Sequence, residues 1–223
     1  MKKLAIMIAV LIGFTASAQI DPDKLSLAIS DAEEANLEQL MEFMWKRYST
    51  VTVDGEVKLE AISDMSFDED GKLQATVVDA DSDVKMKRGI RGKVQKNAIE
   101  NKLEYASQAL EMAIAYTYMS KGQLLDFFEK AEISEQDGVI QAVAGDVFVK
   151  GDKLTVWVES ATNLFTKKQF ESFLGDDRDP VSGEINFGKF SNGVSHALGS
   201  VMQLSSKNAV INAENKDYSK RVH

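Results

Sequence analysis

The 223-residue sequence contains no cysteine and only two prolines and two histidines. The absence of cysteine excludes disulfides, thiolate metal ligands and a lipid anchor on a processed N-terminal cysteine. The protein must therefore be held together by an ordinary hydrophobic core, and its length is ample for one.

Histidine is too scarce for most catalytic or metal-binding groups. His223 ends the chain, and His196 without cysteine builds neither a Cys-His pair nor a His-x-x-x-His zinc motif. The segment around His196, GVSHA, lacks the second glycine of a nucleophile elbow and lies within a predicted strand. We therefore predict no catalytic residues, no metal site and no cofactor, and we expect the protein not to be an enzyme. A carboxylate-based hydrolase stays open as an alternative, although no pair of acidic residues stands out by its spacing.

An excess of positive charge is also missing. The chain has 35 acidic and 26 basic side chains, a net charge of −9, and this balance disfavours nucleic acid and anionic membrane surfaces as partners. Asp79, Asp81 and Asp83 have the opening spacing of a calcium loop, but Val84 and Ile90 occupy the positions of its glycine and glutamate. A solvated acidic loop is the simpler interpretation.

The N-terminus has the pattern of a secretory signal peptide. Lys2 and Lys3 precede an apolar run over residues 4–14, and Ala16-Ser17-Ala18 follows. The run is too short to span a membrane, for which about 20 apolar residues are needed. We predict a signal peptide over residues 1–18 and one domain over residues 19–223, because no linker or repeat divides the rest. The expected location is the periplasm or the extracellular space.

Apolar spacing predicts three helices. A stripe three and four residues apart predicts a helix over 31–48, a long helix is expected over 94–119, and a short one over 124–128. The long helix carries two apolar stripes about 200° apart, which predicts burial on both sides.

Alternating residues and turn signals predict an antiparallel sheet. Trp157 alternates with the apolar residues of its strand, so it should lie on the opposite face, where we expect a helix to cover it. The predicted strands are 50–53, 57–61, 72–78, 139–149, 153–159, 163–173, 183–190, 194–204 and 208–214.

Five segments resemble an uncharacterised family of exported bacterial proteins. The family has an aromatic-Trp-Lys unit, a Lys-Gly-Glu-Val hairpin, a Gly-Asp-x-x-x-x-Trp-x-Asp strand and a C-terminal Glu-Asn-x-x-Tyr strand. This sequence departs from it at Asp54 and Glu159, where the family has Lys and Asp. The matching segments are 44–59, 67–76, 87–93, 151–162 and 211–222.

The layout of that family is similar to the half-barrel of periplasmic lipoprotein carriers of the LolA/LolB type. The resemblance implies an α+β fold in which a curved antiparallel sheet carries an N-terminal helix and a long helix on its concave face. It supplies no catalytic residues.

On this analogy we expect a periplasmic binding protein that holds an apolar or lipid-like ligand between the sheet and the long helix. A basic connector before the long helix, containing Arg88 and Arg91, is expected near an anionic head group; an ordinary solvated connector is the alternative. An envelope structural or interaction protein with a filled core is the alternative function, in which the aromatic and methionine side chains are plain core. The residues expected to line the pocket are Trp45, Tyr105, Met112, Tyr116, Met119 and Trp157.

The signal-peptide interpretation predicts a mature chain that begins at Gln19, because Ala16 and Ala18 are the small residues that signal peptidase reads. Intact-mass spectrometry of exported protein should give the mass of residues 19–223. A mature species that keeps the first 18 residues would overturn the predicted location.

Overall fold

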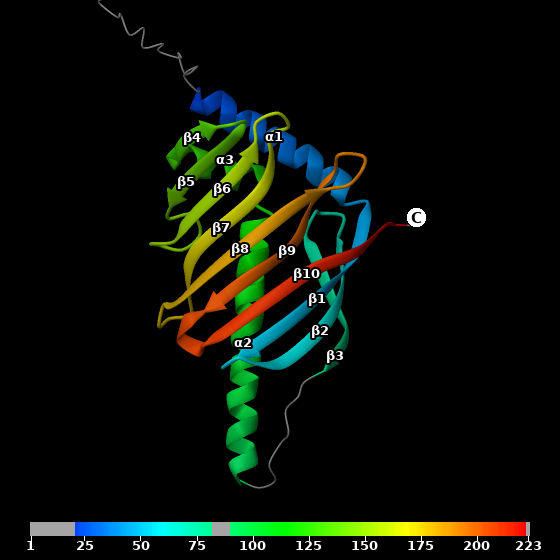
Figure 1. Ribbon diagram of the computed structural model, residues 1–223, viewed down its shortest axis with the longest axis vertical. Helices are drawn as coiled ribbons and strands as arrows, with labels where there is room; N and C mark the ends of the chain where they lie inside the picture. The colour runs from blue at the N-terminus through cyan, green and yellow to red at the C-terminus, as the bar shows by residue number, and fades with distance from the viewer. Residues whose placement is uncertain (1–20, 82–89, 222–223) are drawn as a thin grey trace, which may run out of the picture.

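One antiparallel sheet of ten strands organises the protein (Figure 1). The computed structural model describes residues 21–81 and 90–221, and for 90–103 it describes the backbone alone. The strand order is β3-β2-β1-β10-β9-β8-β7-β6-β5-β4, so the sheet is not closed. The strands are β1 (Phe43–Val53), β2 (Glu56–Phe67), β3 (Leu73–Asp81), β4 (Glu132–Gln136), β5 (Val139–Gly145), β6 (Lys153–Glu159), β7 (Leu164–Leu174), β8 (Asp179–Lys189), β9 (Ser195–Leu204) and β10 (Ala209–Lys220).

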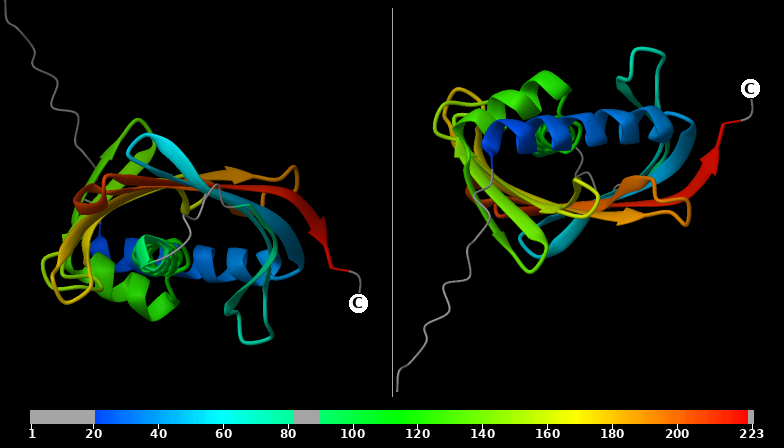
Figure 2. Two further views of the ribbon diagram at one scale, coloured as in Figure 1. Left: turned by 90° about the horizontal axis from the view of Figure 1, so that it is seen from below. Right: turned by 90° about the horizontal axis from the view of Figure 1, so that it is seen from above.

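Three helices lie on the concave side of this sheet. They are α1 (Pro22–Leu40), α2 (Ile90–Thr117) and α3 (Lys121–Lys130). Figure 2 shows the sheet as an arc around α2, with α1 crossing beside its end. The predicted α+β half-barrel, with an N-terminal helix and a long helix on the concave face, is confirmed.

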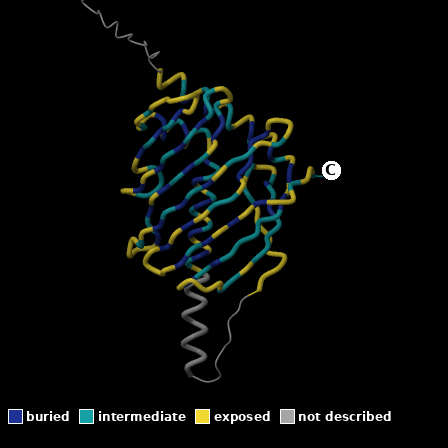
Figure 3. Tube along the Cα trace, viewed as in Figure 1, coloured by how far each residue is buried: buried dark blue, intermediate teal, exposed yellow. Residues whose placement is uncertain are grey.

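The curvature follows from alternation and bulges. Buried and more exposed residues alternate along the strands (Figure 3). In β6, Leu154, Val156 and Val158 are fully buried and face the helices, while the residues between them are partly exposed. Register shifts interrupt five of the strand pairs, β1–β10, β1–β2, β2–β3, β6–β7 and β8–β9. Such bulges bend and twist a sheet locally, which wraps its apolar face around the helices.

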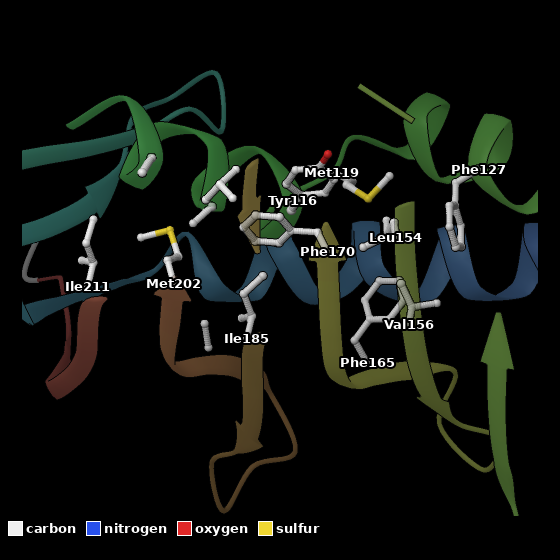
Figure 4. Packing of buried hydrophobic residues seen from close by; sticks show 14 of the residues in the cluster. Tyr116, Met119, Phe127, Leu154, Val156, Phe165, Phe170, Ile185, Met202 and Ile211 are labelled. Carbon is white, nitrogen blue, oxygen red and sulfur yellow. The ribbon is translucent and has the colours of Figure 1, made fainter. Parts of the chain in front are cut away.

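The core has two parts. The larger part packs α2 and α3 on β5–β10 (Figure 4), with Tyr116 stacked on Phe170 at 4.3 Å between ring centroids. The smaller part lies where α1 meets β1 and β2. Its buried residues are Leu40, Phe43, Trp45, Met65, Phe67 and Val194.

The predicted helix over 31–48 is wrong in its second half. Helix α1 ends at Leu40, and residues 43–53 form β1. The segment is rich in aromatic and β-branched residues, and Phe43, Trp45, Val51 and Val53 are buried on one face of a strand paired on both sides. The pairing of β1 with β10, about 170 residues away, overrides the helical spacing.

Two expectations about burial are also wrong. Trp157 alternates with the buried residues of β6 and so lies on the convex face, where it is partly covered by the Lys167 ammonium, 4.9 Å from its ring centroid. Over residues 104–117, the part of α2 whose side chains are described, the helix buries one stripe, centred on Ala109 and Ala113, and exposes Glu111 on its other side. The sequence analysis also missed β4, because only Ile133 of that edge strand is even partly buried.

A substitution at Gly183 tests how tightly the larger part of the core is packed. A Cβ at Gly183 would overlap the ring of Phe170, which cannot move aside because it is stacked on Tyr116. We expect Gly183→Ala to lower the free energy of unfolding by about 1–3 kcal/mol in urea denaturation. Gly122→Ala, in α3 with open space around it, should be neutral or stabilise by up to about 1 kcal/mol. Equal effects of the two substitutions would contradict the packing described.

Candidate functional site

A cavity of about 190 Å³ lies between α1, the turn from α2 to α3, and strands β7–β9. Its apolar wall comes from α1, from α3 with the turn before it, and from the sheet. Its polar wall includes Glu33, Tyr118, Lys168 and His196. Exposed Glu34 and Ser120 also line it, so its mouth lies between α1 and the start of α3. The apolar residues are Leu37, Leu40, Met119, Leu124, Phe165 and Phe187.

Lys168 is the unusual residue of this wall. It is 1% exposed, on the concave face of β7. Its ammonium donates hydrogen bonds to the carbonyl oxygens of Tyr116 (3.2 Å) and Thr117 (2.9 Å), and it lies 3.9 Å from the centroid of the Phe165 ring. These carbonyls end α2, where a helix carries partial negative charge. Lys168 therefore fastens the C-terminal end of α2 to the sheet.

Glu33 of α1 lies on the same wall. Its Oε1 accepts a hydrogen bond from the backbone N–H of Phe165 at 2.8 Å, which ties α1 to the start of β7. Burial raises the pKa of Glu33, and the charge of Lys168 opposes that rise. Burial also lowers the pKa of Lys168 to about 8, while Glu33 raises it. Neither group is well solvated, and each makes the charge of the other less costly.

His196 is 8% exposed and stacks on Phe190 with 3.9 Å between ring centroids. Burial lowers the pKa of His196, so the ring is neutral at physiological pH. Asn36 of α1 fixes this end of β9, because its side chain bonds both the N–H (2.7 Å) and the carbonyl (3.0 Å) of Ser195.

The long helix is closed against the sheet beyond the cavity. The Tyr116 hydroxyl donates to Asp152 at 2.5 Å, and Asp152 accepts three backbone N–H groups of residues 147–149. A smaller cavity beneath α2, lined by residues that include Tyr105 and Ala106, measures about 20 Å³. Small residues, Ala106, Ala109 and Ala113, let the helix approach the sheet closely.

The structure does not gather the predicted pocket residues into one site. Met119 lines the larger cavity and Tyr105 the small one, while Tyr116 and Met112 pack in the core around α2. Trp45 belongs to the smaller core beneath α1, and Trp157 lies on the convex face. Arg88 lies outside the described residues, as does the side chain of Arg91.

Lys168 and Glu33 were missed by the sequence analysis. A signal for Lys168 exists, because it falls in register with Phe170, Ser172 and Leu174, the inward positions of β7. A lysine at an inward position needs a polar partner within the core. Glu33 carries no such signal, since on a helix surface it is an ordinary acidic residue.

Among the side chains described, those of residues 21–81 and 104–221, there is no group of three acidic or histidine residues placed for a metal ion. None of the helices in these ranges is long and apolar enough to cross a membrane.

No family model matches the sequence, and no curated protein matches it. Among solved structures, a DUF1329 family protein from Desulfovibrio piger is similar over 91% of this chain and 95% of its own, with a TM-score of 0.44 and 10% identity. A putative outer membrane lipoprotein-sorting protein domain from Vibrio parahaemolyticus is similar over 88% and 92%, with a TM-score of 0.41 and 10% identity. A LolA superfamily protein from Nitrosomonas europaea is similar over 86% of this chain and 94% of its own, with a TM-score of 0.35 and 9% identity. These are similarities of chain layout, and no residue role follows from them.

The anchoring role of Lys168 predicts a loss of stability in Lys168→Met, which keeps the bulk of the side chain and removes two hydrogen bonds. We expect the free energy of unfolding to fall by about 1–3 kcal/mol at pH 7. Lys167→Met, on the convex face beside half-exposed Glu184, should cost less than about 1 kcal/mol.

The stability difference between wild type and Lys168→Met should also change with pH in a definite direction. The pKa of Lys168, about 8 in the folded protein, lies below its ordinary value of about 10.5. Between these values the unfolded chain binds more protons, so the lysine makes the folded state more stable as pH rises. The difference in unfolding free energy between wild type and Lys168→Met should therefore grow from pH 8 to pH 10. A difference that shrinks over this range would mean that the lysine is not buried as described.

Proposed function

We propose that the protein is an exported, non-enzymatic binding protein that holds a small apolar ligand in the cavity at the C-terminal end of α2. The supporting observation is the cavity itself, about 190 Å³ bounded by two helices and the sheet, whereas the cavity beside Tyr105 and Ala106 of α2 measures about 20 Å³. An apolar cavity of about 150 Å³ is enough to bind benzene. The ligand is therefore of that order of size.

The size of the cavity separates this proposal from a carrier of long acyl chains. Pockets for drug-sized ligands span about 300–1,000 Å³, and the 20 Å³ beneath Tyr105 and Ala106 holds no chain. A long chain would enter only after α2 had left the sheet, which requires breaking the Lys168 and Tyr116 hydrogen bonds.

The polar groups of the wall support binding rather than catalysis. Two N–H groups of Lys168 and one oxygen of Glu33 are engaged with backbone groups. His196 is stacked and neutral. Export is part of the proposal through residues 1–18, whose pattern is that of a signal peptide.

Titration with 1-hexanol, followed by two-dimensional NMR, tests this function. We expect saturable shifts at residues lining the cavity, with a dissociation constant of roughly 0.1–1 mM for seven non-hydrogen atoms. Leu37→Trp fills the cavity from α1 and should abolish binding. Leu27→Trp, on the same helix but 49% exposed, should leave binding unchanged.

A second cavity-filling variant, Met119→Phe, guards against a folding defect in the first. If wild type gives no saturable shifts, or if both filling variants still bind, the proposal fails. The first outcome would favour the alternative of an envelope structural protein, which the close packing of Tyr116 against Phe170 already fits.

A further inference from the structure

Arg47 is a half-buried cation without a counter-ion. It lies in β1 on the concave face, and its Nε donates a hydrogen bond to the Asn215 side-chain oxygen at 3.1 Å. A guanidinium has five N–H groups, and within the described ranges the other four have no hydrogen-bond partner and no carboxylate lies in salt-bridge range. Burial lowers the pKa of Arg47, so its charge is poorly solvated. Buried arginines are ordinarily paired.

The guanidinium is held in place by a fixed network. Asn215 is 7% exposed; its oxygen also accepts from the Trp45 indole at 3.2 Å, and its amide donates to the Ala197 carbonyl at 3.0 Å. Tyr218 donates to the same carbonyl and stacks on Trp45. Arg47 is therefore oriented before any ligand arrives, which lowers the entropy lost on binding.

A second donor beside Arg47 also lacks an acceptor. The Tyr118 hydroxyl is buried without a hydrogen-bond partner, and its phenol is close enough to Arg47 for the two to interact electrostatically. A buried polar group without a partner costs about 1–3 kcal/mol. Arg47 is not among the buried groups without a partner, so its remaining N–H groups are open to solvent. An oxyanion is the group that suits both these N–H groups and the neighbouring Tyr118 hydroxyl.

The surface next to Arg47 is apolar and open. Cross-strand register places Ser63 of β2 opposite Arg47 and Val77 of β3 opposite Ser63, so the three side chains share the concave face. Val77 is 62% exposed. Ala75, next along this face of β3, is exposed as well. An apolar chain that starts at Arg47 has apolar surface to cover along β2 and β3.

We propose that Arg47 and Tyr118 bind the oxyanion head, a carboxylate or phosphate, of an amphiphile whose chain lies on the concave face of β2 and β3. Arginine matches both heads because its N–H groups form parallel, charge-assisted hydrogen bonds. Arg47, Ser63 and Val77 do not line the 190 Å³ cavity, whereas Tyr118 lies between the two sites and lines that cavity as well.

The experiment measures octanoate binding by calorimetry in the Leu37→Trp protein, whose first cavity is filled. We expect Arg47→Gln to weaken octanoate binding at least tenfold, Arg47→Lys to weaken it less, and Tyr118→Phe to weaken it about three- to tenfold. Arg178→Gln removes an exposed arginine in the turn between β7 and β8 and should change affinity less than twofold. Equal octanoate affinity in Arg47→Gln and Arg178→Gln would overturn the proposal.

Stability separates a binding role from a structural one. Arg47→Gln removes a half-buried charge that has no counter-ion, so its melting temperature should equal or exceed that of wild type, while its rise with octanoate is lost. A variant that melts lower and binds octanoate normally would make Arg47 structural.

Three further ligands distinguish the contribution of the anionic head from that of the apolar chain. Octyl phosphate should bind like octanoate, and 1-octanol at least tenfold more weakly. Inorganic phosphate should compete poorly with octanoate. If it binds as tightly as octyl phosphate, the site binds a free anion, and the proposal of an amphiphilic ligand is wrong. Binding of 1-hexanol to Arg47→Gln with Leu37 intact should be normal, so the two proposals can fail separately.

Discussion

The arrangement of the concave side depends on the hydrogen bonds from Lys168 to the end of α2. A lysine within a core is costly unless its charge is compensated, and here the compensation comes from the last carbonyls of the helix, the Phe165 ring and the charge of Glu33. Because Glu33 belongs to α1 and binds the backbone of β7, the same group fixes both helices to one strand. The position of α2 thus follows from electrostatics as well as from apolar packing.

This anchoring decides where room is left beside the C-terminal end of α2. Tyr116, held by Asp152 and stacked on Phe170, seals the sheet beneath α2, and space is left at the helix end, where the chain turns towards α3. On the other side of Tyr118, Arg47 faces the part of the sheet formed by β1–β3. The two proposed sites therefore take different ligand chemistry: apolar groups beside Lys168, whose charge is already compensated, and an anion beside Arg47, whose charge is not.

The sequence predicted the sheet better than the site. Turn residues such as Asp54-Gly55 and strict alternation, as in β6, are local signals, and the strands they delimit agree with the structure. Residues 43–48 were assigned to a helix because their strand conformation depends on pairing with β10, at the far end of the chain. Lys168 was detectable by its inward register, but its acceptors lie about 50 residues away. Arg47 gave no signal at all, since its lack of a counter-ion is a property of the fold.

Hydrogen exchange across α2 tests the central claim that ligand binds with the helix in place. Amide exchange of residues 109–117 should be measured with and without saturating 1-hexanol. If Lys168 holds the helix end while ligand fills the neighbouring cavity, exchange should stay equal or become slower on binding, because ligand stabilises the folded state. Faster exchange in this segment with ligand bound would show that α2 leaves the sheet, and would contradict the account.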